Sequence, residues 1–222
     1  VPTGTADPYA LRRQALGIIN VILKKRYPLS LAQLIDESLA ILGPLLKRPA
    51  GETKADILEF FRGRFENQLL SQGHPYDVVD AVLATGIDDL VRAEQKIQAM
   101  EAFKSHPDFQ PLAIAFKRVA NIIRNVQEST LDPAHFTCTE ERELHDAFLR
   151  IRQIVMGHIA DGRYHVALVA LAQLRKPVDA FFESVLVMAD EEKVRCNRLA
   201  LLMEISTLFH DLADFSKIVT ES

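Results

Sequence analysis

Glycine, tryptophan and cysteine are scarce in this sequence. Its 222 residues include nine glycines, two cysteines and no tryptophan. Leu, Ala, Glu, Arg and Gln are abundant instead, and this set of residues favours helix over strand. Hydrophobic residues make up 48% of the chain, which is enough for a protein of this length to bury a full core. The composition therefore predicts an all-α globular fold.

Long apolar runs are absent as well. The longest candidate, VALVALA at residues 166–172, is far shorter than the roughly 20 residues that cross a bilayer, so we expect no membrane association. Cys138 and Cys196 lack the CxxC spacing of zinc and redox sites, and two free thiols suit a reducing cytoplasm. The first residues, VPTGT, have neither Met nor the pattern of a secretory signal. We therefore expect a cytoplasmic protein and a fragment of a longer polypeptide.

Common catalytic motifs are also missing. The sequence has no GxGxxG, P-loop, HExxH or nucleophile elbow. Two His-Asp dipeptides occur, His145-Asp146 and His210-Asp211, and all-helical metal phosphohydrolases use such a pair with a further His and a distant Asp. The residues that would complete such a set are His106 or His135, and Asp190. With seven histidines among thirty acidic residues, such dipeptides arise by chance, so we expect neither a metal site nor a catalytic residue.

The charge is unevenly distributed. The net charge is −4, which argues against general affinity for nucleic acid, because phosphates are bound by clustered Lys and Arg. Residues 1–51 carry seven Lys and Arg against three Asp and Glu (+4), whereas residues 52–222 carry nineteen against twenty-seven (−8). Any RNA binding must therefore use a local cationic patch, and the acidic remainder would discourage loose binding elsewhere.

Apolar residues recur at helical spacing in the first part of the chain. Asp7 is expected to begin a helix that Pro28 stops, and Ser30 to cap the next one. Together they predict an N-terminal helical hairpin. The segment GPLLKRPAG, from Gly43 to Gly51, contains two prolines and two glycines, and predicts a domain boundary or hinge. We therefore expect one domain at 1–51 and a second at 52–222.

The second predicted domain also has the pattern of successive helices. Asp88 is expected to cap one of them, and Thr137 with Glu140 to form a capping box for another. The final helix is apolar almost all round, which indicates a central, buried position. The expected helices lie at about 53–71 and 75–85, at a segment after Asp88 that holds Leu90 to Ile97, at one after Pro107 that holds Leu112 to Val126, at one that reaches about Ile159, at 163–174, from Pro177 as a separate helix or kink, and from about Asp190 onward. Joined by short loops, they predict an antiparallel helical bundle.

Four stretches of the sequence carry a family resemblance, and they are spread in one order over nearly the whole chain. They are DPYALRRQALGIINVIL from Asp7, GHPYDVVDAVLA from Gly73, LAIAFKRVANI from Leu112, and KPVDAFFESVLVMADEEKVRCNRLALLMEISTLFHDLADFSKI from Lys176 to Ile218. Together they resemble the C-terminal part of the beta subunit of bacterial glycyl-tRNA synthetase. The order and extent of these stretches are far more specific than any one short motif.

The resemblance implies a function in tRNA binding. Residues 52–222 would be a helical domain that binds the anticodon end of a glycine-accepting tRNA, similar to the domains named after an Asp-Ala-Leu-Arg motif. The DPYALRR segment at Asp7 has Pro-Tyr before Ala-Leu-Arg, so it is not counted as that motif. The implied partner is a synthetase alpha subunit, in a heterotetramer of two alpha and two beta chains. ATP and magnesium would be handled by the alpha chain, so no cofactor is expected in this fragment.

An anticodon loop is single-stranded RNA, whose recognition requires cations for phosphates, and flat side chains and amides for bases. Lys117, Asn121 and Arg124 are spaced i, i+4 and i+7, which puts them on one helical face, and Arg118 flanks them. These four residues are the first candidates for RNA contact. The alternative is an ordinary solvated helix face.

A second candidate cluster mixes cations with aromatic residues. Arg62 and Arg64 lie in EFFRGRFENQ, a mixture that suits stacking and phosphate contact. The alternative is that the aromatic residues are core and Arg64 pairs with a neighbouring acid.

Arg195, Asn197 and Arg198 match the family pattern of the last helix and are interpreted as structural first. As a rival function, the chain would be a scaffold that docks the rest of the synthetase without touching RNA. An exposed apolar patch on residues 7–46 would favour that rival.

Overall fold

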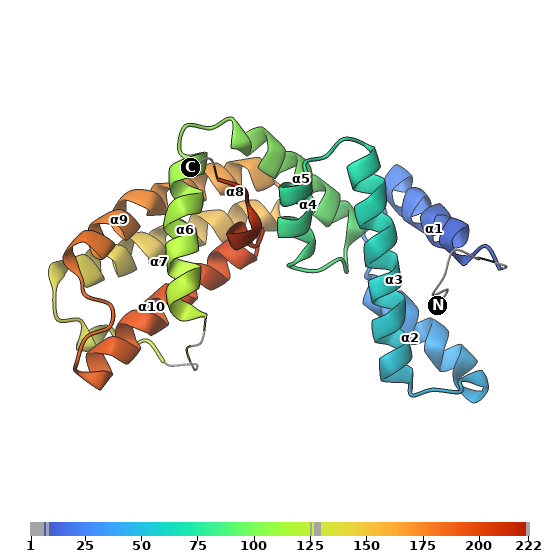
Figure 1. The fold of residues 1–222 in the computed structure, drawn as a ribbon, viewed down its shortest axis with the longest axis horizontal. Helices are drawn as coiled ribbons and strands as arrows, with labels where there is room; N and C mark the ends of the chain where they lie inside the picture. The colour runs from blue at the N-terminus through green and yellow to red at the C-terminus, as the bar shows by residue number, and fades with distance from the viewer. Residues whose placement is uncertain (1–6, 8, 125, 127–129, 221–222) are drawn as a thin grey trace. The chain divides into compact units, whose positions relative to one another are not determined.

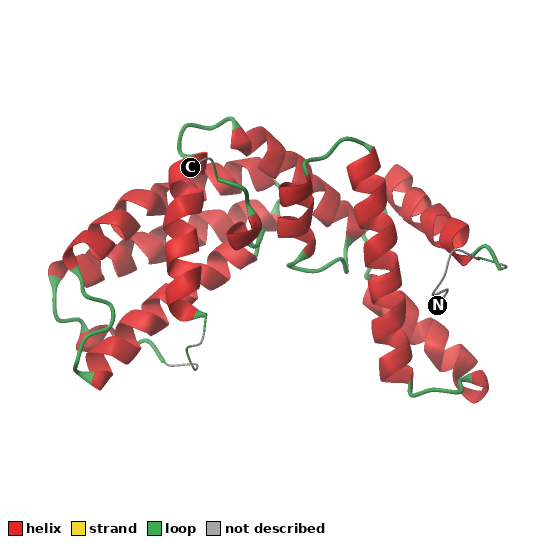
Figure 2. Cartoon of the chain, viewed as in Figure 1, coloured by secondary structure: helices red, strands yellow, loops and turns green. Residues whose placement is uncertain are grey.

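The chain folds into helices joined by turns and loops, shown in a computed structural model that describes residues 7, 9–124, 126 and 130–220 (Figures 1 and 2). No β-strand occurs in this described part, and the all-α prediction is confirmed. The chain divides into two compact units, residues 1–97 and residues 98–222. None of the described helices is both long and apolar enough to cross a membrane.

The first unit is built around one long helix, α3. Both α1 and α2 pack against α3, as does α4, and Phe65 and Leu69 of α3 are fully buried. The elements of this unit are α1 (Leu11–Lys25), α2 (Leu31–Leu42), the 3-10 turn η1 (Gly43–Leu45), α3 (Ala50–Ser71), α4 (Tyr76–Leu83) and the start of α5 (Leu90–Lys104).

The expected domain boundary after residue 51 does not coincide with the division into units. α3 begins at Ala50 and covers both helices of the N-terminal pair, so residues 50–71 belong to the same compact unit as residues 11–42. The division lies inside α5, between Ile97 and Gln98. The separate assignment of 1–51 and 52–222 as domains stays a prediction.

Side chains at the helix starts of this unit account for its first two caps. The Asp7 carboxylate accepts hydrogen bonds from the backbone N–H groups of Leu11 (2.8 Å) and Arg12 (3.0 Å), the first two residues of α1, although the N-cap position is Ala10. The Ser30 hydroxyl accepts from the N–H of Gln33 at 3.1 Å and begins α2. Both oxygens satisfy donors that have no partner inside the helix.

The expectation that Asp88 caps α5 is wrong. Its carboxylate accepts hydrogen bonds from the N–H of Ala32 and the hydroxyl of Ser30, both at 2.8 Å, and thereby supports the start of α2. Asp89 caps α5 instead, accepting from the N–H of Arg92 at 3.0 Å. Because α5 begins at Leu90, Asp89 occupies the position before the first helical residue, whereas Asp88 precedes it by one more.

The second unit consists of helices α6 to α10, together with three short 3-10 turns. Its longest helix, α7, packs against α8, α9 and α10, while α6 packs against α9 and α10. The elements are the end of α5, α6 (Phe109–Ile123), η2 (Pro133–His135), α7 (Thr139–Ala160), α8 (Tyr164–Leu171), η3 (Ala172–Leu174), α9 (Arg175–Ser184), α10 (Glu192–His210) and η4 (Phe215–Lys217).

The core of this unit contains a cluster of phenylalanine rings where α6 meets α10. The Phe116 and Phe209 rings stack with centroids 4.5 Å apart, and Phe215 packs edge-on against Phe209 at 5.2 Å. All three side chains are buried, and α10 buries nine of its residues, as expected for the last helix. The burial of apolar area on this side of α6 fixes which of its residues face outward.

Candidate functional site

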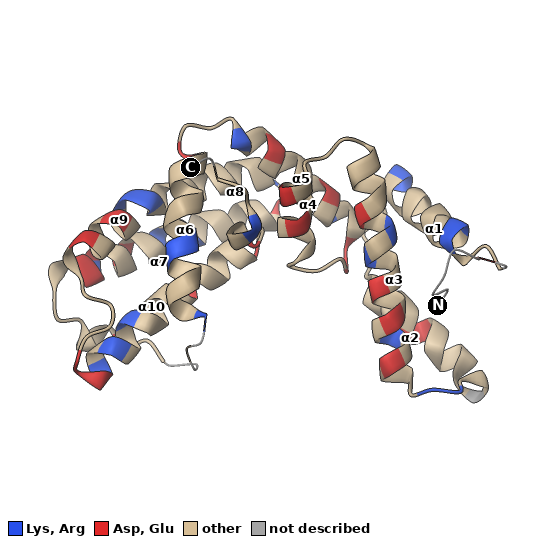
Figure 3. Cartoon of the chain, viewed as in Figure 1, with Lys and Arg blue, Asp and Glu red and all other residues tan. Residues whose placement is uncertain are grey.

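The four α6 candidates occupy the part of that helix that the core leaves outside. Phe109, Leu112, Phe116 and Val119 are buried, while Arg118, Asn121 and Arg124 are exposed and Lys117 is half-buried. α6 contains no acidic residue, and part of its ribbon is blue in Figure 3. Arg124 is the residue that caps its C-terminal end.

The contacts of these side chains leave their positive charge available. Lys117 Nζ donates to the hydroxyl of Thr220 at 3.0 Å, and the Arg118 guanidinium lies 4.2 Å from the centroid of the Phe182 ring. Arg124 donates to the Asn121 side-chain oxygen at 2.9 Å. Within the described residues, none of these three cations pairs with a carboxylate. We call the surface formed by Lys117, Arg118, Asn121 and Arg124 the α6 cationic face.

Arg118 has a preorganised geometry. Its guanidinium stacks on Phe182 of α9, a flat arrangement that restricts the side chain while its hydrogen-bond donors remain at the edge. α6 and α9 pack against each other, so both partners of this pair stand on rigid elements. Phe182 was not among the residues expected from the sequence, because nothing in its local pattern indicates which cation stacks on it.

Arg62 and Arg64 lie in the other compact unit, on α3, and each has its own surroundings. Arg62 lines a cavity of about 320 Å³ together with Glu59 and Asp88. The Arg64 guanidinium lies 5.3 Å from the Phe60 ring centroid and has no carboxylate partner among the described residues. The described contacts thus do not show the alternative, a pairing of Arg64 with a neighbouring acid, and RNA contact by Arg62 and Arg64 stays a prediction.

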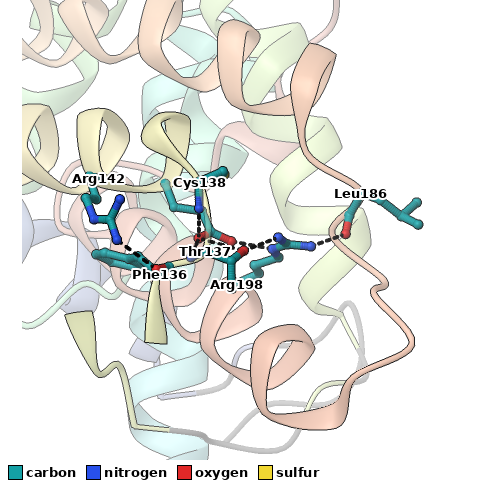
Figure 4. A network of polar contacts seen from close by, with 7 residues as sticks. Phe136, Thr137, Cys138, Arg142, Leu186 and Arg198 are labelled. Atoms are coloured by element: carbon teal, nitrogen blue, oxygen red, sulfur yellow. Dashed lines mark hydrogen bonds and ion pairs between the residues drawn. The ribbon is translucent and has the colours of Figure 1, made fainter. Parts of the chain in front are cut away.

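Arg195, Asn197 and Arg198 of α10 hold loops of the second unit, as their structural interpretation predicts. Arg195 donates to the carbonyl oxygen of Ala189 at 2.8 Å, and the Asn197 side-chain oxygen accepts from the N–H of Asp132 at 2.7 Å. Arg198 reaches three groups. It donates to Glu141, to the Leu186 carbonyl (2.8 Å) and to the Thr137 hydroxyl (3.0 Å) (Figure 4).

Glu141 is the buried centre of this network. Only 1% of the residue is exposed, and its carboxylate accepts from Arg198 and from the N–H groups of Thr137 and Cys138. Burial by itself would raise the pKa of Glu141, but the bonds from Arg198, Thr137 and Cys138 outweigh it, and the pKa lies below its usual value. The capping box expected at Thr137 and Glu140 is therefore wrong by one residue, since the N-cap is Cys138 and its partner is Glu141.

Within the described residues, the two cysteines belong to no disulfide and to no group that could hold a metal ion. Both are half-buried, and burial raises the pKa of the Cys138 thiol, which the adjacent Glu141 charge also favours. A thiol with a raised pKa is a poor nucleophile at neutral pH. Across the described residues, no group of three or more His, Cys, Asp and Glu is arranged to hold a metal ion.

The histidines of the alternative metal site each contact a nearby acid rather than one another. His106, His135 and His145 lie 3.8 Å, 3.1 Å and 3.8 Å from carboxylate oxygens of Asp108, Asp132 and Asp146. Each of these pairs is local in sequence, so the fold does not bring the three histidines to one described centre.

Comparison with known proteins gives the class of the second unit. Residues 112–219 match the family model of the DALR anticodon binding domain. This segment includes α6 from Leu112 onward and all of α10. The second unit is thus a helical domain of the anticodon-binding class. Residues 1–84, which include α1 to α4, match the model of the glycyl-tRNA synthetase beta subunit.

Similar proteins cover the whole chain. It is 58% identical over 222 residues to the glycine–tRNA ligase beta subunit of Syntrophus aciditrophicus, covering all of this chain and 32% of that protein. The corresponding proteins of Geobacter metallireducens and Syntrophotalea carbinolica are 52% and 47% identical over 218 residues, covering 98% of this chain and 32% of each protein. The chain belongs to the glycyl-tRNA synthetase beta subunit family, and spans about a third of the length of the curated relatives it matches.

Proposed function

We propose that this chain is the tRNA-binding, anticodon-recognising part of a glycyl-tRNA synthetase beta subunit. It supports the ligation of glycine to tRNA, which is carried out with the alpha subunit. The α6 cationic face is the observation that carries the proposal, because it lies inside the segment that matches the DALR model and has no acidic neighbour on its helix.

Each part of the α6 cationic face has a separate task. The guanidinium and ammonium groups of Arg124 and Lys117 bind phosphates and so position the loop. The Asn121 amide, which is exposed, donates to or accepts from a base edge. Arg118, held flat on Phe182, offers a plane on which an unstacked base can lie.

The chain supplies binding energy and orientation and contributes no catalytic residue. Holding the anticodon end fixes where the other end of the tRNA lies relative to the catalytic centre, and this positioning lowers the entropic part of the barrier. ATP and magnesium are used by the parent complex, a cytoplasmic heterotetramer of two alpha and two beta chains, and not by this part of it.

Local charge decides where the tRNA binds. Residues 98–222 carry fourteen Lys and Arg against eighteen Asp and Glu, a net charge of −4, so the unit as a whole repels RNA. The cations of the α6 cationic face are therefore favoured over the remaining surface, which restricts binding to one orientation.

Alanine at Lys117, Arg118 and Arg124 tests the proposal. We expect the affinity for glycine-accepting tRNA to fall by at least about tenfold at 50 mM salt, measured by filter binding. A control that removes the same charge replaces Arg150, Arg163 and Lys193, which are exposed cations on other parts of the second unit. Unchanged affinity in the first variant, or an equal loss in the control, would reject the α6 cationic face.

Recognition of the anticodon is tested with a second tRNA. A glycine tRNA with an altered anticodon should bind more weakly than the natural one, and the triple alanine variant should lose most of that difference. Equal binding of the two tRNAs by the unaltered chain would mean that it binds RNA without reading the anticodon.

A second function, docking of the rest of the synthetase, is favoured by an apolar groove in the first unit. The groove has a volume of about 490 Å³, and Leu11, Ile18, Leu45 and Phe61 are among its lining residues. Leu45 is 76% exposed and Ile18 47% exposed, an unusual state for large apolar side chains on adjoining elements. Leu11, Ile18 and Leu45 lie within residues 7–46, where an exposed apolar patch is expected to favour docking, whereas Phe61 of the same groove lies on α3.

Replacing Ile18 and Leu45 with Glu tests docking. Both side chains are exposed, so the first unit should keep its helicity, while association with the alpha subunit or with the remainder of a full-length beta chain should weaken in sedimentation. Full association of this variant would reject docking through the groove. Because tRNA binding by the α6 cationic face does not depend on these residues, the two functions are separable.

A further inference from the structure

A second cavity in the first unit has a very different lining from the apolar groove. It has a volume of about 560 Å³ and lies between α1 and the C-terminal half of α3. Its polar lining consists of Asn20 from α1, of Arg64, Asn67, Gln68 and Ser71 from α3, and of Gln72, the C-cap of α3. Apart from Leu16, every lining residue carries hydrogen-bonding groups, one carries a positive charge, and none is acidic. We call this the Arg64 pocket.

The hydrogen bonds within the Arg64 pocket leave several groups for a ligand. Gln68 donates to the Asn20 side-chain oxygen at 3.0 Å, which leaves the Asn20 amide hydrogens facing outward on an exposed residue. Asn67 donates to the Gly63 carbonyl at 2.6 Å, which leaves its side-chain oxygen as an acceptor. The pocket therefore offers both donors and acceptors at its surface.

Two buried side-chain atoms of the lining residues lack a partner within the described residues. They are Nε of Arg64, a donor, and the side-chain oxygen of Gln68, an acceptor. A buried polar group without a hydrogen bond is costly, and in a native protein it calls for an explanation such as a ligand.

We propose that the Arg64 pocket is a second RNA contact, which binds the ribose-phosphate backbone of the tRNA; this rests on the proposed function. A ribose 2′-hydroxyl at the pocket surface accepts from the Asn20 amide and donates to the Asn67 side-chain oxygen. The neighbouring phosphate is bound by the Arg64 guanidinium, which stacks on Phe60 and pairs with no carboxylate among the described residues.

The composition of the pocket favours RNA over a protein partner. Much of the binding energy of protein interfaces comes from buried apolar and aromatic side chains. The groove at Leu45 has such a lining, whereas the Arg64 pocket has a single apolar residue, Leu16. Amides around one unpaired guanidinium, with no acidic residue in the lining, suit a negatively charged polymer rich in hydroxyl groups. The tRNA would then contact both compact units of the chain.

Asn20→Asp tests the Arg64 pocket with little effect on the fold. The new side chain keeps an oxygen that accepts from Gln68 and adds a negative charge at an exposed position of α1. Affinity for glycine-accepting tRNA should fall about tenfold at 50 mM salt, and by much less at 500 mM, because the added repulsion is screened. Gln98→Glu, the same charge change at an exposed residue of α5, is the matched control and should bind like the unaltered chain.

Arg64→Ala and Gln68→Ala remove the guanidinium and the amide that bonds to Asn20. Both should weaken tRNA binding several-fold while circular dichroism stays unchanged, and Gln68→Ala should also lower the preference for the tRNA over an all-2′-deoxy analogue of the same sequence. Equal affinity of the Asn20→Asp, Arg64→Ala and Gln68→Ala variants and the unaltered chain would overturn the inference. Loss of binding to the alpha subunit instead of tRNA would also overturn it, in favour of a protein ligand.

The outcomes separate this inference from the proposed function. If the unaltered chain binds no tRNA, or if the triple variant of the α6 cationic face binds as well as the unaltered chain, the proposed function fails. If that triple variant loses affinity while the three pocket variants do not, the proposed function stands and only the second contact is rejected.

Discussion

At the scale of single residues, the polar network around Glu141 shows what the sequence can and cannot reveal. The family pattern and the position of Arg198 at the start of a buried helix indicate a structural role. The partner is Glu141, which lies 57 residues earlier in the chain, and no local spacing points to it. A contact of this kind depends on how α7 and α10 pack, so it becomes visible only in the fold.

Removing Arg198 is predicted to be strongly destabilising. Arg198→Ala leaves the Glu141 carboxylate buried without its cation, and a loss of about 3–5 kcal/mol in the free energy of unfolding is expected. Urea denaturation followed by circular dichroism measures it. Arg198→Lys keeps the charge but loses the fork that also reaches Leu186 and Thr137, so it should lie between alanine and the unaltered chain. Equal stability of all three would show that the pair contributes nothing.

The network also predicts how stability depends on pH. The pKa of Glu141 is lower in the folded chain than its usual value, so the contribution of its charge to stability is present above the pKa of the unfolded state. That contribution is lost as the pH falls through the lower, folded pKa. Glu141→Gln should therefore be less stable than the unaltered chain at pH 7, and the difference in free energy of unfolding should shrink below about pH 4. A difference that is constant from pH 7 to pH 3 would contradict this.

At the scale of helices, the sequence predicts most of the elements but misplaces some caps. The apolar spacing of α6 and α10 correctly gives their buried faces, because that pattern follows directly from helix geometry. The caps at Asp88 and Thr137 are each wrong by one residue. A cap requires one position relative to the first helical residue, and sequence patterns locate helix ends only to within a residue or two. α6 likewise ends at Ile123 and not at Val126.

The two neighbouring aspartates before α5 are predicted to stabilise different helices. Asp88→Ala removes the acceptor for Ala32 and Ser30 and should loosen the start of α2, whereas Asp89→Ala should loosen the start of α5. Each should cost about 1 kcal/mol in stability. Amide hydrogen exchange distinguishes them, since faster exchange should appear near residue 32 in the first variant and near residue 92 in the second. Faster exchange at the same helix in both variants would contradict the assignment.

At the scale of the whole chain, the number of charged residues follows from the sequence, but their positions in space depend on the fold. Residues 1–97 carry twelve Lys and Arg against twelve Asp and Glu and are neutral, while residues 98–222 carry the full net charge of −4. The count divided at residue 51 separates the basic helix α1 from α3, which contains four acidic residues and packs on it. Which cations remain unpaired depends on tertiary contacts such as that of Arg118 with Phe182.

The salt dependence of tRNA binding tests this local placement of charge. For single-stranded nucleic acid, the logarithm of the affinity falls with the logarithm of the salt concentration by about 0.7 for each phosphate neutralised. If Lys117 and Arg124 each neutralise one phosphate, replacing all three cations with Ala should lower the magnitude of the slope by about 1.4 between 50 mM and 200 mM salt. The control at Arg150, Arg163 and Lys193 removes the same formal charge and should leave the slope unchanged. Equal slopes for both variants would contradict the local placement. They would mean that binding depends on the total charge of the unit and not on contacts between individual cations and phosphates, which release counterions one contact at a time.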